Sequence, residues 1–298
     1  MRLVITGASG FLGRHVLDSI VKKNESRSAP HHIIATFHRK TSNLPTYPFV
    51  TWKQFDLQKE PRNVFGKLDE PHALLHLAWQ GLPNYQSNHH LEEELPRHID
   101  FIQAMVEGGI HGVAIAGTCY EYGLQNGCLA ENLPANPVTA YAEAKNKLRC
   151  YIEELSKEQN VSFSWFRIFY LYGSDQPSRT LYSQLLKAIR ENKKTFDMSG
   201  GEQVRDYLPI YKASHLVSER FMKLAESGTG DGIVNIASGR GKTVLSIVKK
   251  WIRENNSTIK PNLGVFPYPS HEPMEFWADT TKLNKLSDGI DPDLSPHR

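Results

Sequence analysis

The chain has 298 residues, of which 40% are hydrophobic, and a formal net charge of +3 at pH 7. This length suits one sizeable domain, or a large domain with a smaller lobe. Because the charge is not gathered into a basic block and no apolar run has the length of a membrane span, we expect no nucleic-acid partner and no membrane partner.

The cysteines and the first residues both indicate in which cellular compartment the protein is found. Cys119, Cys128 and Cys150 are an odd number without metal-ligand spacing, which favours a reducing compartment and predicts no disulfide framework and no metal site. Met1 is followed directly by an apolar strand and a glycine turn, without the apolar stretch of a signal peptide. We therefore expect a cytoplasmic protein.

The first predicted element is a strand, Leu3 to Ile5, followed by Gly7, Gly10 and Gly13 and then by apolar residues at helical spacing. Glycines in a strand-to-helix turn let backbone amides approach a pyrophosphate at the helix N-terminus. Such a turn can also need glycines for steric reasons alone. At the start of a chain of alternating strands and helices, we interpret it as a dinucleotide site.

The second predicted strand, His32 to Phe37, ends in His38, Arg39 and Lys40 rather than in an acidic residue. A carboxylate at this position would bind a free ribose 2′-hydroxyl, whereas cations suit a 2′-phosphate. The pattern therefore favours NADP(H) over NAD(H). The alternative is that Arg39 and Lys40 are solvated loop charges.

Two further predicted strands end near the same edge of the sheet. Asp56, followed by Leu57, comes after a third candidate strand and either accepts a hydrogen bond from the adenine amino group or caps a helix. The apolar strand 73–79 should end beside the cofactor. The adjacent His89 and His90 would point apart on any regular element, so they predict no metal site.

The stretch Tyr141 to Lys145 begins a predicted helix that runs to Leu155. Residues four apart share a helix face, so a proton donor would lie beside a fixed cation. An ammonium at ~4 Å can lower a tyrosine pKa from ~10 by about three units. Thr118, at the carboxyl end of the strand 112–116, can bind a carbonyl oxygen or Tyr141. The alternatives are a chance spacing, and a threonine that only caps a loop.

Continued alternation up to the strand 161–168 predicts an α/β fold, a Rossmann-type doubly wound parallel sheet with a smaller, mixed C-terminal substrate lobe. We expect residues 1–173 with 204–237 to form the NAD(P)-binding domain. Residues 174–203 with 238–285 would form the substrate lobe, and residues 286–298 a frayed tail.

Several motifs, in their order and spacing, resemble the extended short-chain dehydrogenases/reductases, the family of nucleotide-sugar epimerases, dehydratases and 4-keto reductases. These motifs, which together cover nearly the whole chain, are Thr6–Gly13, His76–Ala78, Gly117–Thr118, Tyr141 with Lys145, Arg167–Gly173 and Arg205–Tyr207. The resemblance makes Tyr141 the acid/base, Lys145 its electrostatic partner and a ribose ligand, and Thr118 the group that positions the substrate carbonyl.

The resemblance also implies binding residues. The cofactor contacts, besides His38 to Lys40, Asp56 and Leu57, would be Gly7, Ser9, Gly10, Phe11, Leu12, Leu77, Ala78, Trp79, Tyr141, Lys145 and Phe169. Arg205 matches the arginine that binds the substrate diphosphate, and Cys119, Tyr120, Tyr170 and Arg179 are further substrate candidates. Family members are commonly dimers, which implies a homodimer through the helices 99–106 and 141–155.

Departures from the family pattern narrow the reaction. Dehydratases carry an Asp-Glu pair after the threonine, where this chain has Cys119 and Tyr120, so dehydration is not expected. The GDP-fucose synthase branch shares the cysteine but has a histidine where this chain has Arg179, which disfavours coupled epimerisation. Tyr170 and Glu94 each stand where the family has an asparagine, which bears on the geometry of proton transfer.

The favoured reaction is therefore the NADPH-dependent reduction of the 4-keto group of a nucleotide-linked 4-keto-6-deoxy sugar, of dTDP or GDP type. The alternatives are an NAD-dependent nucleotide-sugar 4-epimerase and, from another class, a non-catalytic NADP-binding sensor. The complete set of Tyr141, Lys145 and Thr118 argues against the sensor, because a sensor needs no proton donor.

Overall fold

The structure is a computed structural model that describes residues 1–39, 44–59, 63–268 and 272–287. The chain divides into two compact units. The first comprises residues 1–121, 137–167 and 214–234, and the second comprises residues 122–136, 168–213 and 235–298. Lys40 and residues 288–298 lie outside the described residues, so the predicted contact of Lys40 and most of the predicted tail are not described.

The central sheet has the strand order β3-β2-β1-β4-β5-β7-β12 in the described part of the chain. The strands from β1 to β5 pair in parallel. The elements are β1 (Arg2–Thr6), α1 (Phe11–Glu25), β2 (His32–Phe37), β3 (Val50–Gln54), α2 (Val64–Lys67), β4 (Ala73–His76), the π-helix η1 (His90–Glu94), α3 (Leu95–Glu107), β5 (Gly112–Thr118), the 3₁₀-helix η2 (Cys119–Tyr122), α4 (Ala140–Gln159), β7 (Ser162–Ile168), α6 (Ile210–Ser227) and β12 (Gly232–Ile236).

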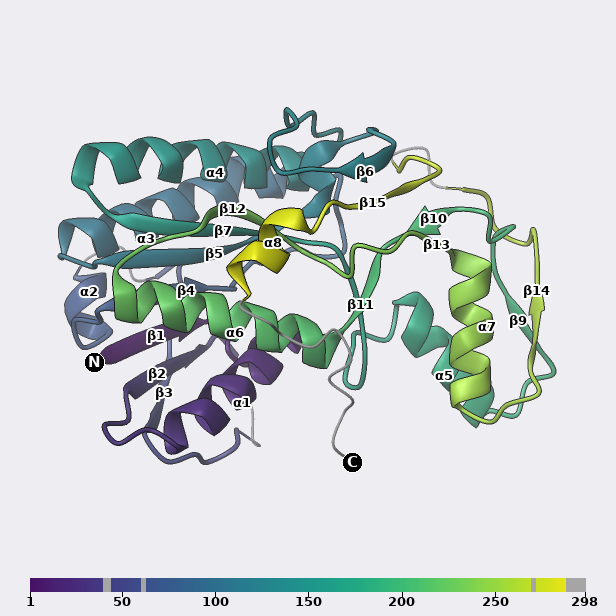
Figure 1. Ribbon diagram of the computed structural model, residues 1–298, viewed down its shortest axis with the longest axis horizontal. Helices are drawn as coiled ribbons and strands as arrows, with labels where there is room; N and C mark the ends of the chain where they lie inside the picture. The colour runs from purple at the N-terminus through teal and green to yellow at the C-terminus, as the bar shows by residue number, and fades with distance from the viewer. Residues whose placement is uncertain (40–43, 60–62, 269–271, 288–298) are drawn as a thin grey trace. The chain divides into compact units, whose positions relative to one another are not determined.

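Helices cover both faces of this sheet, α3 and α4 on one and α1 and α6 on the other (Figure 1). A strand covered on both faces has no solvent side, which is why β1 and β4 are continuous apolar runs rather than alternating ones. The doubly wound parallel sheet and the Rossmann-type fold class predicted from the sequence are confirmed.

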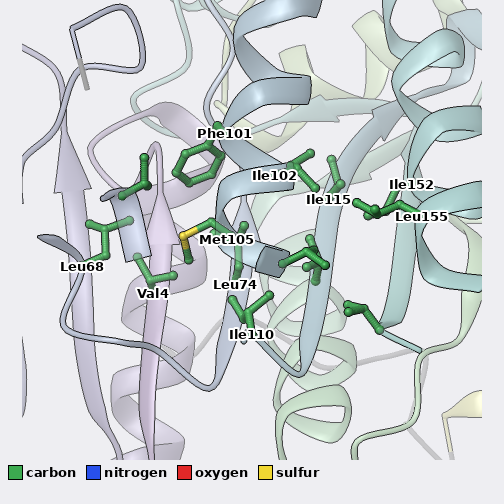
Figure 2. Close-up of a cluster of buried hydrophobic side chains, with 14 of the residues drawn as sticks. Val4, Leu68, Leu74, Phe101, Ile102, Met105, Ile110, Ile115, Ile152 and Leu155 are labelled. Atoms are coloured by element: carbon green, nitrogen blue, oxygen red, sulfur yellow. The ribbon is translucent and has the colours of Figure 1, made fainter. Parts of the chain in front are cut away.

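A buried hydrophobic cluster joins one sheet face to its helices (Figure 2). Val4 and Leu74 from β1 and β4 contact the same cluster as Ile102 and Met105 of α3 and Ile152 of α4. This packing fixes α3 and α4 against the strands whose carboxyl ends carry the candidate active site.

The second unit contains short strand pairs and a separate core. Its elements are β6 (Gly127–Leu129), β8 (Tyr170–Tyr172), α5 (Leu181–Arg190), β9 (Thr195–Asp197), β10 (Val204–Arg205), β11 (Tyr207–Pro209), β13 (Lys242–Thr243), α7 (Val244–Glu254), β14 (Lys260–Asn262), β15 (Phe276–Ala278) and α8 (Thr281–Leu286). Leu185 of α5 packs with Val248 and Trp251 of α7. The pairs β8–β11, β9–β14 and β6–β15 are parallel, and β10–β13 is antiparallel.

The compact units differ in their bounds from the two functional domains expected from the sequence. Residues 122–136 and 204–213, which the sequence pattern assigned to the NAD(P)-binding domain, belong to the second unit. The short strands of these residues pair with other segments of the second unit: β6 pairs with β15, β10 with β13, and β11 with β8. The division of binding roles between the domains stays a prediction.

Candidate active site

The glycine turn after β1 lines a cavity at the carboxyl edge of the sheet. The residues around it are Thr6, Gly7, Ser9, Gly10, Thr36, His38, Phe55, Leu57, Leu77, Ala78, Trp79, Gln80 and Glu94. Gly7 has φ +69°, and a Cβ placed on it would lie 2.7 Å from the backbone nitrogen of Ala78. Only glycine allows the turn to approach the end of β4 this closely. The turn and the end of β4 therefore lie against each other at the edge of this cavity.

An exposed cation, Arg39, follows the end of β2. Arg39 lines a second hollow together with Ser9 and His38. The carboxylate of Asp56 lies 3.3 Å from His38 Nε2 and accepts the Gln58 amide at 3.0 Å. Burial by itself would raise the pKa of Asp56, but these two contacts bring it below its ordinary value. Asp56 is thus a charged cap for the turn that follows β3.

Helix α4 begins at Ala140, directly after the capping residue Thr139. The Thr139 hydroxyl accepts a hydrogen bond from the Ala142 amide at 3.2 Å, and the Tyr141 amide donates to the Tyr85 carbonyl at 3.0 Å. Both bonds satisfy amide groups that a helix start otherwise leaves without partners. They hold the backbone of Tyr141 in place.

Lys145, one turn further along α4, is buried and held at two places. Its Nζ donates to the carbonyl of Ala116 at 2.9 Å and lies 3.9 Å from the ring centroid of Trp79. Burial lowers the pKa of Lys145 to about 7, although the carboxylates of Glu121 and Glu94 favour its charged form. The ammonium therefore titrates near neutrality.

Tyr141 is 7% exposed, and its phenol is surrounded by aromatic rings and by Thr118. Burial raises the pKa of Tyr141, the charges of neighbouring groups including Glu121 add to this, and the hydrogen bond with Thr118 acts in the opposite direction. The expected lowering of this pKa by Lys145 is wrong for this structure, because desolvation outweighs it. Tyr141 therefore keeps its proton at neutral pH and is poised as an acid.

The buried ion pair of Glu121 and Arg167 holds the backbone of Thr118 in place. Glu121 is fully buried and receives hydrogen bonds from Arg167 Nε at 2.8 Å, Trp165 Nε1 at 2.9 Å and the Thr118 amide at 2.8 Å. This carboxylate is held by three donors, so it is a structural anchor for the end of β5 rather than a reacting acid.

Cys119 and Tyr120 follow Thr118 on η2. Cys119 is 5% exposed and adds to the raised pKa of Tyr141, while the ring of Tyr120 meets that of Tyr85 at 5.1 Å. Neither side chain is a carboxylic acid, so this turn lacks the acid pair expected of a dehydratase. Their roles as substrate contacts stay predictions.

Phe11 and Leu12 begin α1 in the first unit, and the remaining predicted residues lie in the second unit. Arg205 is 2% exposed, donates to the Glu272 carboxylate at 2.8 Å and lies 5.8 Å from the Tyr170 ring. Phe169 is buried, and its amide donates to the Ile236 carbonyl at 3.1 Å. Arg179 is exposed, on the loop before α5. The unit brings Tyr170 and Arg205 together, and their contact with substrate stays a prediction.

The sequence reasoning did not connect a set of buried polar residues in the first unit, and it did not name His98. Its members are Thr6, His76, His98 and Glu94, all at most 2% exposed. Apolar periodicity alone marked His76 only as part of a strand. The spacing His90, Glu94, His98 repeats every four residues and was the signal available.

Among the described residues, no three His, Cys, Asp or Glu side chains are grouped so that they could hold a metal ion. A search of the same residues finds no helix whose length and apolar character would let it cross a membrane.

The fold and the Tyr-Lys-Thr cluster define an extended short-chain dehydrogenase/reductase, and residues 3–237 match the model of the NAD dependent epimerase/dehydratase family. The chain belongs to this family, and it is an enzyme. The predicted family is confirmed.

Three similar proteins illustrate the relationship. The dTDP-6-deoxy-L-talose 4-dehydrogenase (NAD(+)) of Aggregatibacter actinomycetemcomitans is 31% identical over 93% of this chain and 99% of its own. The structure of UDP-N-acetylglucosamine 4-epimerase from Methanobrevibacter ruminantium M1 superposes with a TM-score of 0.82 at 20% identity, covering 98% of this chain and 93% of its own. MoeE5 in complex with UDP-glucuronic acid and NAD gives a TM-score of 0.78 at 20% identity, covering 96% and 92%. At these identities the two structures support the fold alone.

Proposed function

We propose that this enzyme reduces the 4-keto group of a nucleotide-linked 4-keto-6-deoxy sugar, with NADPH as the preferred hydride donor. The relative in Aggregatibacter is named for the 4-dehydrogenation of a dTDP-6-deoxy sugar. A catalyst of hydride transfer works in both directions, so the reverse of such a reaction is a 4-keto reduction.

The observation that carries the proposal is the buried Tyr141, which holds its proton and hydrogen-bonds with Thr118. Reduction of a ketone needs an acid at the carbonyl oxygen, and a protonated phenol in a water-poor site supplies it. The carboxylate that follows, Glu121, is occupied by Arg167 and the Thr118 amide, so it is not available for the elimination step of a dehydratase.

The site's own residues account for the proton transfer. When bound, the dinucleotide supplies the hydride that forms the new C4–H bond. The Thr118 hydroxyl holds the substrate carbonyl oxygen beside Tyr141, whose phenol gives its proton to that oxygen and becomes a phenolate. The Lys145 ammonium stabilises the phenolate electrostatically.

The cavity at the glycine turn is the proposed site of the dinucleotide. Gly7, Ser9 and Gly10 line this cavity, and α1 begins at Phe11, directly after Gly10, so its N-terminal amides lie at the same turn. Ser9 and Gly10 would hold the pyrophosphate, and Lys145 the ribose. Arg39 beside Ser9 favours a 2′-phosphate, whereas the name of the Aggregatibacter relative specifies NAD(+). A comparison of kcat/KM with NADPH and with NADH distinguishes between the two cofactors.

The test is the oxidation of NADPH and of NADH with dTDP- and GDP-4-keto-6-deoxyhexoses. We expect turnover with at least one sugar and a higher kcat/KM with NADPH. Binding of the dinucleotide without turnover of either sugar would contradict the reductase. Interconversion of C4 epimers without net cofactor consumption would instead establish the 4-epimerase, and a higher kcat/KM with NADH would overturn the cofactor preference.

The pKa of Lys145 predicts a pH dependence. Because this pKa is lowered to about 7, the ammonium is charged below that pH and loses its charge above it. The kcat/KM for the dinucleotide reports groups of the free enzyme and should fall about tenfold per pH unit on the alkaline side. A Lys145→Arg variant keeps its cation and should show a flat, lower profile. A wild-type profile that is flat from about pH 6 to about pH 9 would contradict this assignment.

Two further expectations remain proposals. We propose a homodimer through α3 and α4, which is tested by light scattering, and a cytoplasmic location, which is tested by fractionation of the source cells.

A further inference from the structure

A chain of hydrogen bonds runs through the first unit between the ends of β1 and η1. Thr6 Oγ1 lies 2.7 Å from His76 Nδ1, His76 Nε2 lies 2.6 Å from His98 Nδ1, and His98 Nε2 lies 3.3 Å from Glu94 Oε2. Both histidines are fully buried. Thr6 and Glu94 line the same cavity as the glycine turn. The chain thus lies directly beneath the proposed cofactor site.

The carboxylate determines which nitrogen of each histidine carries the proton. Burial alone would raise the pKa of Glu94, but hydrogen bonds from His98 and the Gln80 amide bring it to about 2. Burial lowers the pKa of His98 to about 4, and that of His76 falls well below its ordinary value. Neutral His98 must donate through Nε2 to the carboxylate, so its Nδ1 accepts from His76 Nε2, and His76 Nδ1 accepts from Thr6.

Glu94 is surrounded by nitrogen atoms of its own chain. The Gln80 amide donates to Oε2 at 2.9 Å, Arg97 Nη1 donates to Oε1 at 3.0 Å, and His89 Nε2 lies 3.4 Å from Oε1. With His98, these contacts occupy both carboxylate oxygens. Glu94 therefore holds the loop after β4 in place rather than offering its oxygens to a ligand.

The loop that Glu94 holds carries Trp79, and two histidines fix its indole. The ring of His98 stacks on Trp79 at 4.3 Å with an interplanar angle of 10°, and Trp79 Nε1 donates to His90 Nδ1 at 3.1 Å. His90 Nε2 in turn donates to the Asn84 carbonyl at 3.0 Å. The same indole contacts the Lys145 ammonium at 3.9 Å and the Tyr141 ring at 5.9 Å.

We propose that Glu94 is a positioning residue of this active site, which acts through His98 and Trp79 to hold the Lys145 ammonium beside Tyr141. The role in catalysis rests on the proposed function, while the effect on the geometry and charge of Lys145 does not. An aromatic face attracts a cation most strongly in a desolvated site, so the orientation of the indole bears directly on the lysine.

The charge of Glu94 also acts on Lys145 directly. The titratable groups that interact with the lysine are His76, His90, His98, Glu94 and Glu121. Arg97 pairs with Glu94, Arg167 pairs with Glu121, and Tyr141 lies four residues before the lysine on α4. Of these, the carboxylates Glu94 and Glu121 favour the ammonium. Removal of either negative charge makes the lysine lose its proton at a lower pH.

Glu94→Gln tests the proposal, with Glu92→Gln as the matched control from the exposed side of the same turn. We expect Glu94→Gln to lower kcat for the ketone about 10- to 100-fold, with a KM for the nucleotide sugar within about twofold of wild type. The alkaline limb of the rate profile should move down by about one pH unit. Glu92→Gln should match wild type in kcat, in KM and in the position of the alkaline limb. Equal effects of the two variants, or a change confined to KM, would overturn the proposal.

A measurement without substrate separates this proposal from the proposed function. Lysine labelled with ¹³C at Cε, assigned with Lys145→Arg, reports the titration of Lys145 by NMR. Its midpoint should fall in Glu94→Gln and stay unchanged in Glu92→Gln. If wild type reduces no 4-keto sugar but the midpoint moves, the reductase is wrong and the positioning holds. An unmoved midpoint overturns the positioning whatever the turnover.

Variants of Trp79 keep the proposal testable if Glu94→Gln does not fold. Trp79→Phe retains an aromatic face for the ammonium, whereas Trp79→Leu removes it. We expect Trp79→Leu to lower kcat at least about tenfold more than Trp79→Phe. Equal kcat values of the two folded variants would overturn the role of the indole.

Discussion

Replacement of Tyr141 by phenylalanine is expected to lower kcat for ketone reduction by about 10²- to 10⁴-fold, which is the range that general-acid catalysis contributes. The phenol is the group that gives its proton to the carbonyl oxygen, and it keeps this proton at neutral pH because burial raises its pKa. The ring itself, packed against Trp79 and His90, remains in the variant. The affinity for the dinucleotide, measured by fluorescence titration, should therefore stay within about threefold of wild type.

Tyr151→Phe is the control for this variant. Tyr151 lies on the same helix α4, but its hydroxyl donates to Gln103 Oε1 at 3.2 Å near the surface. It should lose a hydroxyl without losing activity. A Tyr141→Phe enzyme that retains more than about a tenth of wild-type kcat would show that another group is the acid.

Glu121→Gln is expected to destabilise the protein by about 3–5 kcal/mol, which is the range for breaking a buried ion pair by removal of one charge. The Arg167 guanidinium is 1% exposed and loses the carboxylate that lies 2.8 Å from its Nε. The urea concentration at the midpoint of unfolding of the first unit measures the change. The Thr118 amide donates to the same carboxylate, so kcat should fall as well.

The double variant distinguishes a lost ion pair from a general packing defect. Glu121→Gln combined with Arg167→Gln should destabilise less than the sum of the two single changes, because the charge and its partner leave together. Glu158→Gln, an exposed change on α4, should stay within about 0.5 kcal/mol of wild type. If the destabilisation of the double variant equals the sum of the two single variants, Glu121 and Arg167 are not energetically coupled.

The first unit was largely predictable because its elements are long and locally patterned. The predicted strand His32 to Phe37 matches β2, and the predicted helix Tyr141 to Leu155 lies within α4. The strand predicted to reach Trp79 ends at His76, because the following residues turn to meet Gly7. In long segments, the spacing of the apolar side chains is enough to predict a helix or a strand.

The short strands of the second unit could not be predicted from the sequence. These strands have two or three residues and pair with distant segments, as β6 does with β15, so no local pattern exists to detect. Helix α7 was different. Val244, Val248 and Trp251 repeat at helical spacing after the capping residue Thr243, and this signal was overlooked within a segment interpreted only as a lobe.

The sequence by itself determined the order of strands and helices, the glycine turn, and the pairing of Tyr141 with Lys145 on one helix face, since each depends on residues within a few positions of one another. The family followed from the same motifs. Only the tertiary structure decided that Tyr141 keeps its proton, because the pKa depends on burial by elements far away in the sequence. It also decided that Thr6, His76, His98 and Glu94 form one hydrogen-bonded chain, because the sheet brings together Thr6 and His76, which are 70 positions apart.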